Sequence, residues 1–146
     1  MTAPSDRPHY LLDQSVMSRY WAKPVVKRKI DQLAVVGVLC ACTVTMDEAR
    51  FSARNAQDLK FITELYGSVF RWQVFDDEVE KQVALIRSAL WKIGAGRGAQ
   101  TTDVHIAAVA LRHDATVVHN DTDFVTIQRA VPELKQLWVM PSEDVD

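Results

Sequence analysis

The chain has little cysteine. Its 146 residues include only Cys40 and Cys42, in a Cys-x-Cys arrangement. Residues two apart on a strand point the same way but seldom form a disulfide, and no second Cys/His pair completes a zinc site. We therefore interpret both as small buried apolar residues and expect a cytoplasmic protein.

The chain also lacks an excess of either charge and any long apolar run. Lys and Arg number 17 and Asp and Glu 19, for a net charge of -2. This charge balance excludes a nucleic-acid-binding surface that is basic throughout. It allows a local group of basic residues around an acidic pocket. Residues 1–8 contain no apolar signal region, and no run is long enough to span a membrane. We expect no membrane association.

Glycine is scarce, with five residues. No Gly-x-Gly-x-x-Gly follows the first apolar strand, which argues against a Rossmann-type nucleotide enzyme. A calcium EF-hand loop starting at Asp121 is excluded, because its sixth position is Thr126 and its twelfth is Pro132. A phosphoryl-transfer Asp-x-Asp-x-Thr box also fails, since Val125 occupies the threonine position.

What is present is an alternation of strand-like and helix-like segments. This alternation favours a parallel sheet covered on both faces. We predict an α/β fold, a three-layer α/β/α sandwich with a mainly parallel sheet, as one domain over 1–146 with its core at about 10–140. The expected strands are 10–13, 35–40, 71–75, 116–119 and 137–140. One helix is expected to start at 15, and the others to cover 25–33, 43 or 45 to 54, 55–69, 76 or 77 to 93, and 101–112. A glycine-rich loop is expected at 94–98.

Four acidic residues stand at the ends of these elements: Asp13, Glu48, Asp103 and Asp121. Burying carboxylates without partners is costly, so a cluster of them needs a cation. All-oxygen ligands suit Mg²⁺ or Mn²⁺, which usually also bind substrate phosphate. The sequence therefore points to metal-dependent phosphodiester chemistry.

Asp13 and Glu48 each have a structural alternative. Asp13 follows a strand and is equally well placed to cap the next helix. Thr45 to Glu48 fits a capping box, in which Glu48 reaches back to the helix start. Phe51, three residues after Glu48, suggests instead that this helix face turns inward.

Asp103 is the most informative of the four. With Thr101 or Thr102 as N-cap it lies in the first helical turn, where the helix dipole favours an anion. Its face continues through apolar Ile106 and Ala107, and this favours a functional role over a solvent-facing one. Asp121 and Asp123 have the alternative of a turn aspartate and an N-cap for a helix starting at Phe124.

Four segments in this order resemble one family: Tyr10–Ser15, Glu48–Asn55, Thr102–Ala110 and Val117–Phe124. From about Tyr10 to Met140 the chain is similar to the PIN-domain ribonucleases, in particular the VapC-type toxins of bacterial toxin–antitoxin pairs. The resemblance implies that the catalytic, metal-binding acids are Asp13, Glu48, Asp103 and Asp121, with Asp123 as an accessory ligand.

The chain departs from the family pattern at three places. Gln14 stands where Thr or Ser is common, although Ser15 supplies the next hydroxyl. Arg50 stands where a small residue is usual, and His119-Asn120 precedes Asp121 where a Thr or Ser often lies. None of these changes removes a carboxylate. We interpret His119 as a strand-end histidine.

The resemblance implies a Mg²⁺- or Mn²⁺-dependent endoribonuclease in which a metal-activated water hydrolyses RNA, leaving a 5′ phosphate and a 3′ hydroxyl. Ser15, Arg50 and Arg97 are candidate substrate-binding residues, because nucleic-acid affinity depends on phosphate contacts. The resemblance also implies a homodimer and a cognate antitoxin, with the apolar segments 21–30 and 61–70 as a possible groove for an antitoxin helix. The alternative is a catalytically silent PIN-like module that binds RNA or a partner.

Overall fold

A five-stranded parallel sheet organises the molecule. The structure, a computed structural model, describes residues 7–140. Within that range the strand order is β3-β2-β1-β4-β5, and every pairing is parallel. The strands are β1 (His9–Leu12), β2 (Val38–Ala41), β3 (Arg71–Trp72), β4 (Ala115–His119) and β5 (Lys135–Trp138).

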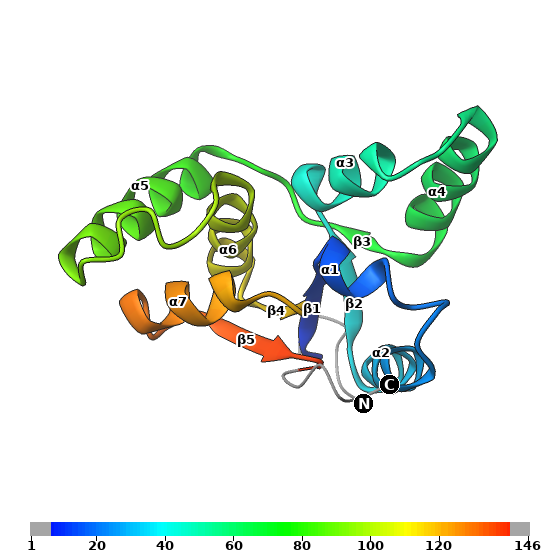
Figure 1. Ribbon diagram of the computed structural model, residues 1–146, viewed down its shortest axis with the longest axis horizontal. Helices are drawn as coiled ribbons and strands as arrows, with labels where there is room; N and C mark the ends of the chain where they lie inside the picture. The colour runs from blue at the N-terminus through cyan, green and yellow to red at the C-terminus, as the bar shows by residue number, and fades with distance from the viewer. Residues whose placement is uncertain (1–6, 141–146) are drawn as a thin grey trace.

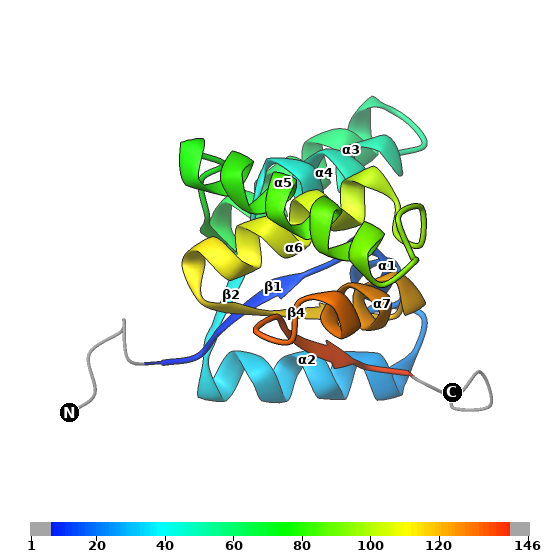
Figure 2. The same cartoon turned by 90° about the vertical axis from the view of Figure 1, so that its left-hand side faces the viewer.

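Helices cover both faces of the sheet. Figure 2 shows α2 beneath the strands and α3 to α7 above them, and Figure 1 shows the same layers from another side. The described helices are α1 (Gln14–Met17), α2 (Pro24–Val36), α3 (Thr43–Phe51), α4 (Ala56–Val69), α5 (Asp77–Lys92), α6 (Thr101–His113) and α7 (Thr122–Ala130). The predicted α/β/α sandwich is confirmed, and its sheet is wholly parallel.

Two large hydrophobic cores lie between the layers, and a smaller cluster of Ala41, Met46, Ala49 and Tyr66 packs between β2, α3 and α4. Leu11 and Val117 point to one face and pack with buried residues of α5, α6 and α7. Their neighbours Leu12 and Val118 point to the other face and pack against α1 and α2. This alternation follows from the two-residue period of a strand.

The second strand begins later than predicted. Residues 35 and 36 belong to the end of α2, and their side chains are exposed. The chain then turns into β2 at Gly37, where a Cβ atom would lie 2.5 Å from both the Pro8 carbonyl oxygen and the Tyr10 ring. Only glycine fits this close approach, so the chain turns at Gly37, inside the segment that was predicted to be a continuous strand.

The third strand is shorter than the predicted 71–75. Arg71 and Trp72 pair with β2, and Gln73 N–H donates one further bond to Ala41 O at 2.9 Å before the chain leaves the sheet. The fifth strand, by contrast, starts two residues before the predicted 137. The prediction therefore made one edge strand too long and placed the other, of the predicted length, two residues too late.

The carboxyl ends of β1, β2 and β4 lie at the same edge of the sheet. Asp13 follows β1, Cys42 and α3 follow β2, and Asp121 follows β4. In open parallel sheets this edge is where ligands bind. Within residues 7–140, the helices are all too short or too polar to cross a membrane.

Candidate metal centre

Asp13 lies at the start of α1 and is buried, with 4% of its surface exposed. Its Oδ2 accepts from the Ser15 N–H at 3.2 Å and from the Ser15 hydroxyl at 2.5 Å. The predicted N-cap role is therefore confirmed. Burial raises the pKa of Asp13, the two Ser15 bonds lower it, and the charge of Asp121 raises it further. The capping role leaves Asp13 beside a second acid, so capping and metal binding are compatible.

Asp103 points into the protein from the first turn of α6. The N-cap of this helix is Gln100, rather than Thr101 or Thr102 as predicted, and it makes no side-chain capping bond. Asp103 is 6% exposed, and Ile106 and Ala107 beyond it are fully buried. Burial, first, and a hydrogen bond with Asp123, second, raise the pKa of Asp103 to about 9. Without a cation nearby, this carboxyl group stays protonated at neutral pH.

Asp121 caps α7 and holds the start of that helix against the acids. Its Oδ1 accepts from the Asp123 N–H at 2.9 Å. The predicted start of this helix at Phe124 with Asp123 as its cap was wrong, because α7 begins at Thr122. Asp123 is therefore free to bond elsewhere, and its Oδ2 accepts from the Gln100 N–H at 3.0 Å. This bond ties the start of α7 to the start of α6.

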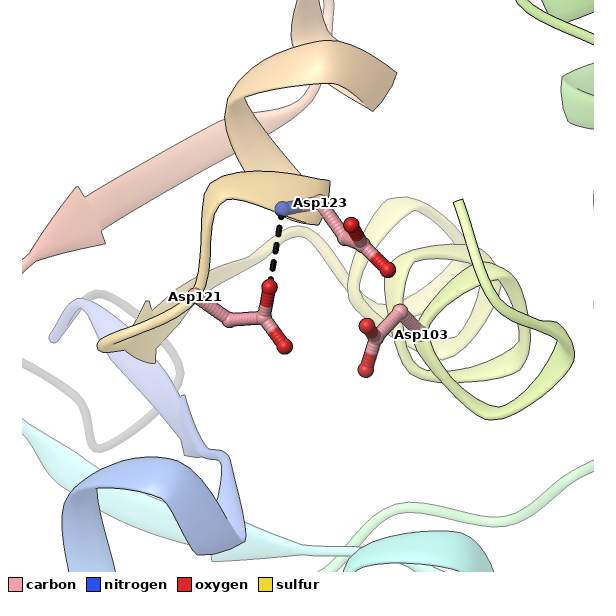
Figure 3. Close-up of side chains that lie close together, drawn as sticks. All are labelled: Asp103, Asp121 and Asp123. Carbon is pink, nitrogen blue, oxygen red and sulfur yellow. Dashed lines mark hydrogen bonds between the residues drawn. The ribbon is translucent and has the colours of Figure 1, made fainter. Parts of the chain in front are cut away.

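Three carboxylates converge at this point. One oxygen from each of Asp103, Asp121 and Asp123 lies within 4.8 Å of the other two. Figure 3 shows the three side chains from α6 and the start of α7 pointing toward a common space. Oxygen donors at this spacing are suited to a hard divalent cation, which neutralises charges that otherwise repel.

Glu48 faces the same centre from α3. The capping box of α3 is formed by Cys42 and Thr45, whose hydroxyl accepts from the Cys42 N–H at 2.9 Å. The alternative of Glu48 as the capping residue was therefore wrong. Burial, then Asp13, then Asp121 raise the pKa of Glu48 to about 7. Among the described residues, no group bonds its buried Oε1.

The expectation that Phe51 turns inward with Glu48 was also wrong. Phe51 is 92% exposed at the last position of α3. Helix α3 ends there, three residues before the predicted Arg54. The inward orientation of Glu48 therefore comes from the position of α3 over the sheet edge, and not from an apolar face shared with Phe51.

The three candidate substrate contacts are placed differently. Ser15 uses its hydroxyl to hold Asp13 and accepts from the Asn120 N–H at 2.9 Å, so it joins two loops of the site. Arg50 is exposed beside Glu48, with its guanidinium 3.8 Å from Asp47. Arg97 is exposed in the loop before α6. Their contact with substrate stays a prediction.

A hydrogen-bond chain that runs from Asp121 through His119 was missed by sequence reasoning, and its residues are buried or half-buried. His119 is fully buried. Its Nδ1 accepts from the Asp121 N–H at 3.1 Å, so Nε2 carries the proton and donates to Gln136 Oε1 at 2.6 Å. Gln136 then donates to Gln128 Oε1 at 3.0 Å, and Gln128 donates to the Leu134 carbonyl at 2.8 Å. The signal in the sequence was a set of polar side chains within apolar surroundings.

Comparison with known proteins agrees with this geometry. A model of the PIN domain family matches residues 10–130. The chain is 31% identical over 142 residues to Ribonuclease VapC51 of Mycobacterium tuberculosis, covering 94% of this chain and 97% of that protein. It is also 31% identical over 131 residues to Ribonuclease VapC21 of the same species, covering 90% and 94%.

A solved structure shows the same fold. The structure of VapBC2 from Rickettsia felis, bound to a DNA fragment from their promoter, matches with a TM-score of 0.73 and 15% identity over 88% of this chain and 97% of that one. The family match spans β1 to α7 and so contains all five acids. This chain belongs to the PIN domain family and, within it, is of the VapC type.

Proposed function

We propose that the protein is a Mg²⁺- or Mn²⁺-dependent endoribonuclease and the toxin of a toxin–antitoxin pair. The observation that carries the proposal is the convergence of Asp103, Asp121 and Asp123 at the sheet edge, with Asp13 and Glu48 electrostatically coupled to them. The similarity to proteins named Ribonuclease VapC supports RNA as the substrate.

The donor set fits a hard divalent ion. The contributing groups are all carboxylates, and Glu48 has a buried oxygen for which no bond is found among the described residues. Burial and mutual repulsion raise the pKa values of Asp103 and Glu48, so a cation is required to keep both ionised at neutral pH. When bound, a divalent ion would supply positive charge at the scissile phosphate and acidify a water at that position.

The protein itself fixes the acids before any ion binds. Ser15 orients Asp13, the Gln100 N–H orients Asp123, and the Asp123 N–H orients Asp121. Each of these bonds uses one oxygen of its carboxylate. Such fixed donors reduce the reorganisation that ligand binding requires. Arg50 and Arg97 would supply positive charge for the RNA backbone.

An antitoxin is the proposed protein partner. A matching structure from Mycobacterium tuberculosis is described as a member of the VapBC family of toxin–antitoxin systems. A groove of about 350 Å³ is lined by Trp21 and by the α4 residues Phe61 and Leu65. The predicted apolar segments therefore meet, and an amphipathic helix is the element that such a groove binds. We also propose a homodimer and a cytoplasmic location, as the resemblance implies.

The test of the nuclease uses purified protein and total cellular RNA with Mg²⁺, Mn²⁺ or EDTA. We expect discrete cuts that require the metal and that fall by about 10²–10³-fold in Asp103→Asn, because one preorganised group at the reacting phosphate is lost. Asp114→Asn is the matched control, since Asp114 is exposed and pairs with Lys135 at 2.8 Å on the surface.

Three results would contradict the proposal. Cuts that persist in EDTA would remove the metal from the mechanism. Intact RNA with every metal, from folded protein freed of any co-purified inhibitor, would instead favour the catalytically silent binding module. Equal loss in Asp114→Asn and Asp103→Asn would show that the effect is not specific to the acid centre.

A further inference from the structure

A second groove adjoins the proposed antitoxin groove, and Gln14 and Ser52 line both. It lies between α3 and α6 and has a volume of about 680 Å³. Of the five proposed metal-binding acids, Glu48 is the one that lines this groove. The remaining lining comes mainly from α3 and from the first turns of α6, including Val44, Phe51, Thr102 and His105.

Phe51 is the feature of this groove that packing does not explain. Its side chain is 92% exposed, the largest exposed fraction among the exposed large hydrophobic residues of the described chain. It lies three residues after Glu48 on α3, and both residues line this groove. An aromatic ring is thus presented to solvent directly beside a proposed catalytic carboxylate.

The residues that line the groove disfavour a phosphate and favour a neutral ring. Asp47 and Glu48 both line it, and their carboxylates repel a phosphate that is not held by a cation. The apolar surface comes from Val44 and Phe51, whereas Thr102 and His105 bring groups that form hydrogen bonds. A flat heterocycle with polar edges matches this combination of an aromatic wall and polar contacts.

We propose that this groove binds one unpaired nucleobase of the RNA, stacked on Phe51 next to the scissile phosphate. The inference rests on the proposed nuclease function and adds a specificity-determining residue to it. A base can stack in this way only when it is not paired, so the groove selects single-stranded or looped RNA. Arg50, at the rim of the same groove, is placed to contact the backbone of that nucleotide.

The two grooves are distinct but share a boundary. Gln14 and Ser52 line both, and Gln14 Nε2 donates to Ser52 Oγ at 3.5 Å between them. Phe51 lines only the groove beside α6, whereas Phe61 lines only the groove beside α4. A substitution at Phe51 therefore tests the base-binding groove without changing the α4 groove.

The experiment compares Phe51→Ala, Phe51→Trp and the control Val35→Ala on a short single-stranded RNA that carries a mapped cut site. Val35 is 80% exposed on α2, on the other face of the sheet. Because Phe51 is exposed, all variants should keep the wild-type Tm. We expect Phe51→Ala to raise KM by about 5- to 100-fold, the range of one base–aromatic stack, with a smaller change in kcat. Phe51→Trp should stay near wild type.

A set of RNAs that each lack one base locates the stacked position. Removing the base at one position should weaken cleavage by wild type, and the same removal should change little in Phe51→Ala, because the two losses concern one contact. Equal effects of base removal in both proteins would overturn the inference. So would a Phe51→Ala variant with wild-type KM, including one in which only inhibition by the antitoxin is lost.

The same reagents separate this inference from the nuclease itself. If wild type does not cut the RNA, the proposed function fails, and binding of the same fluorescein-labelled RNA is measured by anisotropy. Binding that is weaker in Phe51→Ala and retained in Phe51→Trp would then still support the groove. Binding that is equal in all variants would overturn it.

Discussion

The carboxyl end of β4 lies between two clusters of buried polar side chains, and the two are balanced in different ways. On one side, His119, Gln136 and Gln128 form a chain in which each successive donor finds an acceptor. On the other side, the carboxylates of Asp103 and Glu48 face like charges and have raised pKa values. The hydrogen bonds of the first cluster are made within the protein, whereas the acids of the second cluster require a cation from outside it.

This difference separates structure from function. Buried polar groups that are fully bonded make the fold specific and rigid. Buried acids that repel each other destabilise the folded state and are retained where a ligand offsets the repulsion. The backbone N–H of Asp121 joins the two clusters, because it donates to His119 while the Asp121 side chain belongs to the acids. The hydrogen-bond chain of His119 thereby positions Asp121, which is one of the acids.

The largest expected effect is on the pH dependence of stability without metal. The folded-state pKa values of Glu48 and Asp103, about 7 and about 9, exceed their ordinary values of 4.5 and 3.8. Between pH 6.5 and 8.5 the folded state therefore holds more protons than the unfolded state, and stability falls as pH rises. One such group gives a slope of up to about 1.4 kcal/mol per pH unit. Solvent screening reduces the contribution of Glu48 to this slope.

Thermal unfolding in EDTA across this window measures the slope. Burial lowers the pKa of His119, but an unfolded histidine titrates at about 6.5, so its opposing effect lies mainly below the window. Asp103→Asn should flatten the slope and raise Tm at pH 8.5, while Asp114→Asn should do neither. Saturating Mg²⁺ should abolish the slope, because the ion keeps the acids deprotonated across this window. A flat profile for wild type in EDTA would remove the proposed difference between the clusters.

Sequence reasoning located the acids because strand ends can be read from local patterns. Asp13 and Asp121 follow short apolar strands, and parallel strands bring their carboxyl ends to one edge. The acid at Glu48 was harder to place, since its local pattern resembled a capping box and only the long-range position of α3 showed otherwise. Gly37 likewise acts through a contact with Tyr10 that no local pattern encodes.

The His119 chain could not be predicted for the same reason. His119, Gln136 and Gln128 come from β4, β5 and α7, and each looks unremarkable in its own segment. Their partnership depends on the register between β4 and β5, which pairs His119 with Trp138 and places Gln136 two residues before Trp138, on the same face of the sheet. The sequence thus predicted residues whose role depends on their own element, and missed those whose role depends on pairing between elements.

The next largest effect is expected at the hydrogen-bond chain of His119. His119→Ala removes a fully buried ring that lies 4.8 Å from the Phe124 ring and leaves Gln136 without its donor. A cavity together with an unpaired buried group should lower the free energy of unfolding by about 2–4 kcal/mol, measured by urea titration. His113→Ala, which removes a partly exposed histidine bonded to the Val74 carbonyl, should lower it by less than about 1 kcal/mol. Equal losses would show that the buried chain contributes nothing specific.

The smallest effect is expected at Ser15, which connects the acids to the loop after β4. Ser15→Ala removes the hydroxyl bond to Asp13 and the acceptor for the Asn120 N–H, and should destabilise the fold by about 1 kcal/mol. Because the lost bond lowers the pKa of Asp13, that pKa should rise further in the variant, and protons should compete better with the metal.

Mg²⁺ titrations at pH 6 and pH 8 would separate these two consequences. Affinity should drop more at pH 6, where the higher Asp13 pKa matters, while the loss of stability in metal-free protein stays about the same at both pH values. Ser68→Ala is the matched control, because its hydroxyl bonds only carbonyls of its own helix α4. A Ser15 variant whose Mg²⁺ affinity fell equally at both pH values would assign the serine to the geometry of the loops, and not to the ionisation of Asp13.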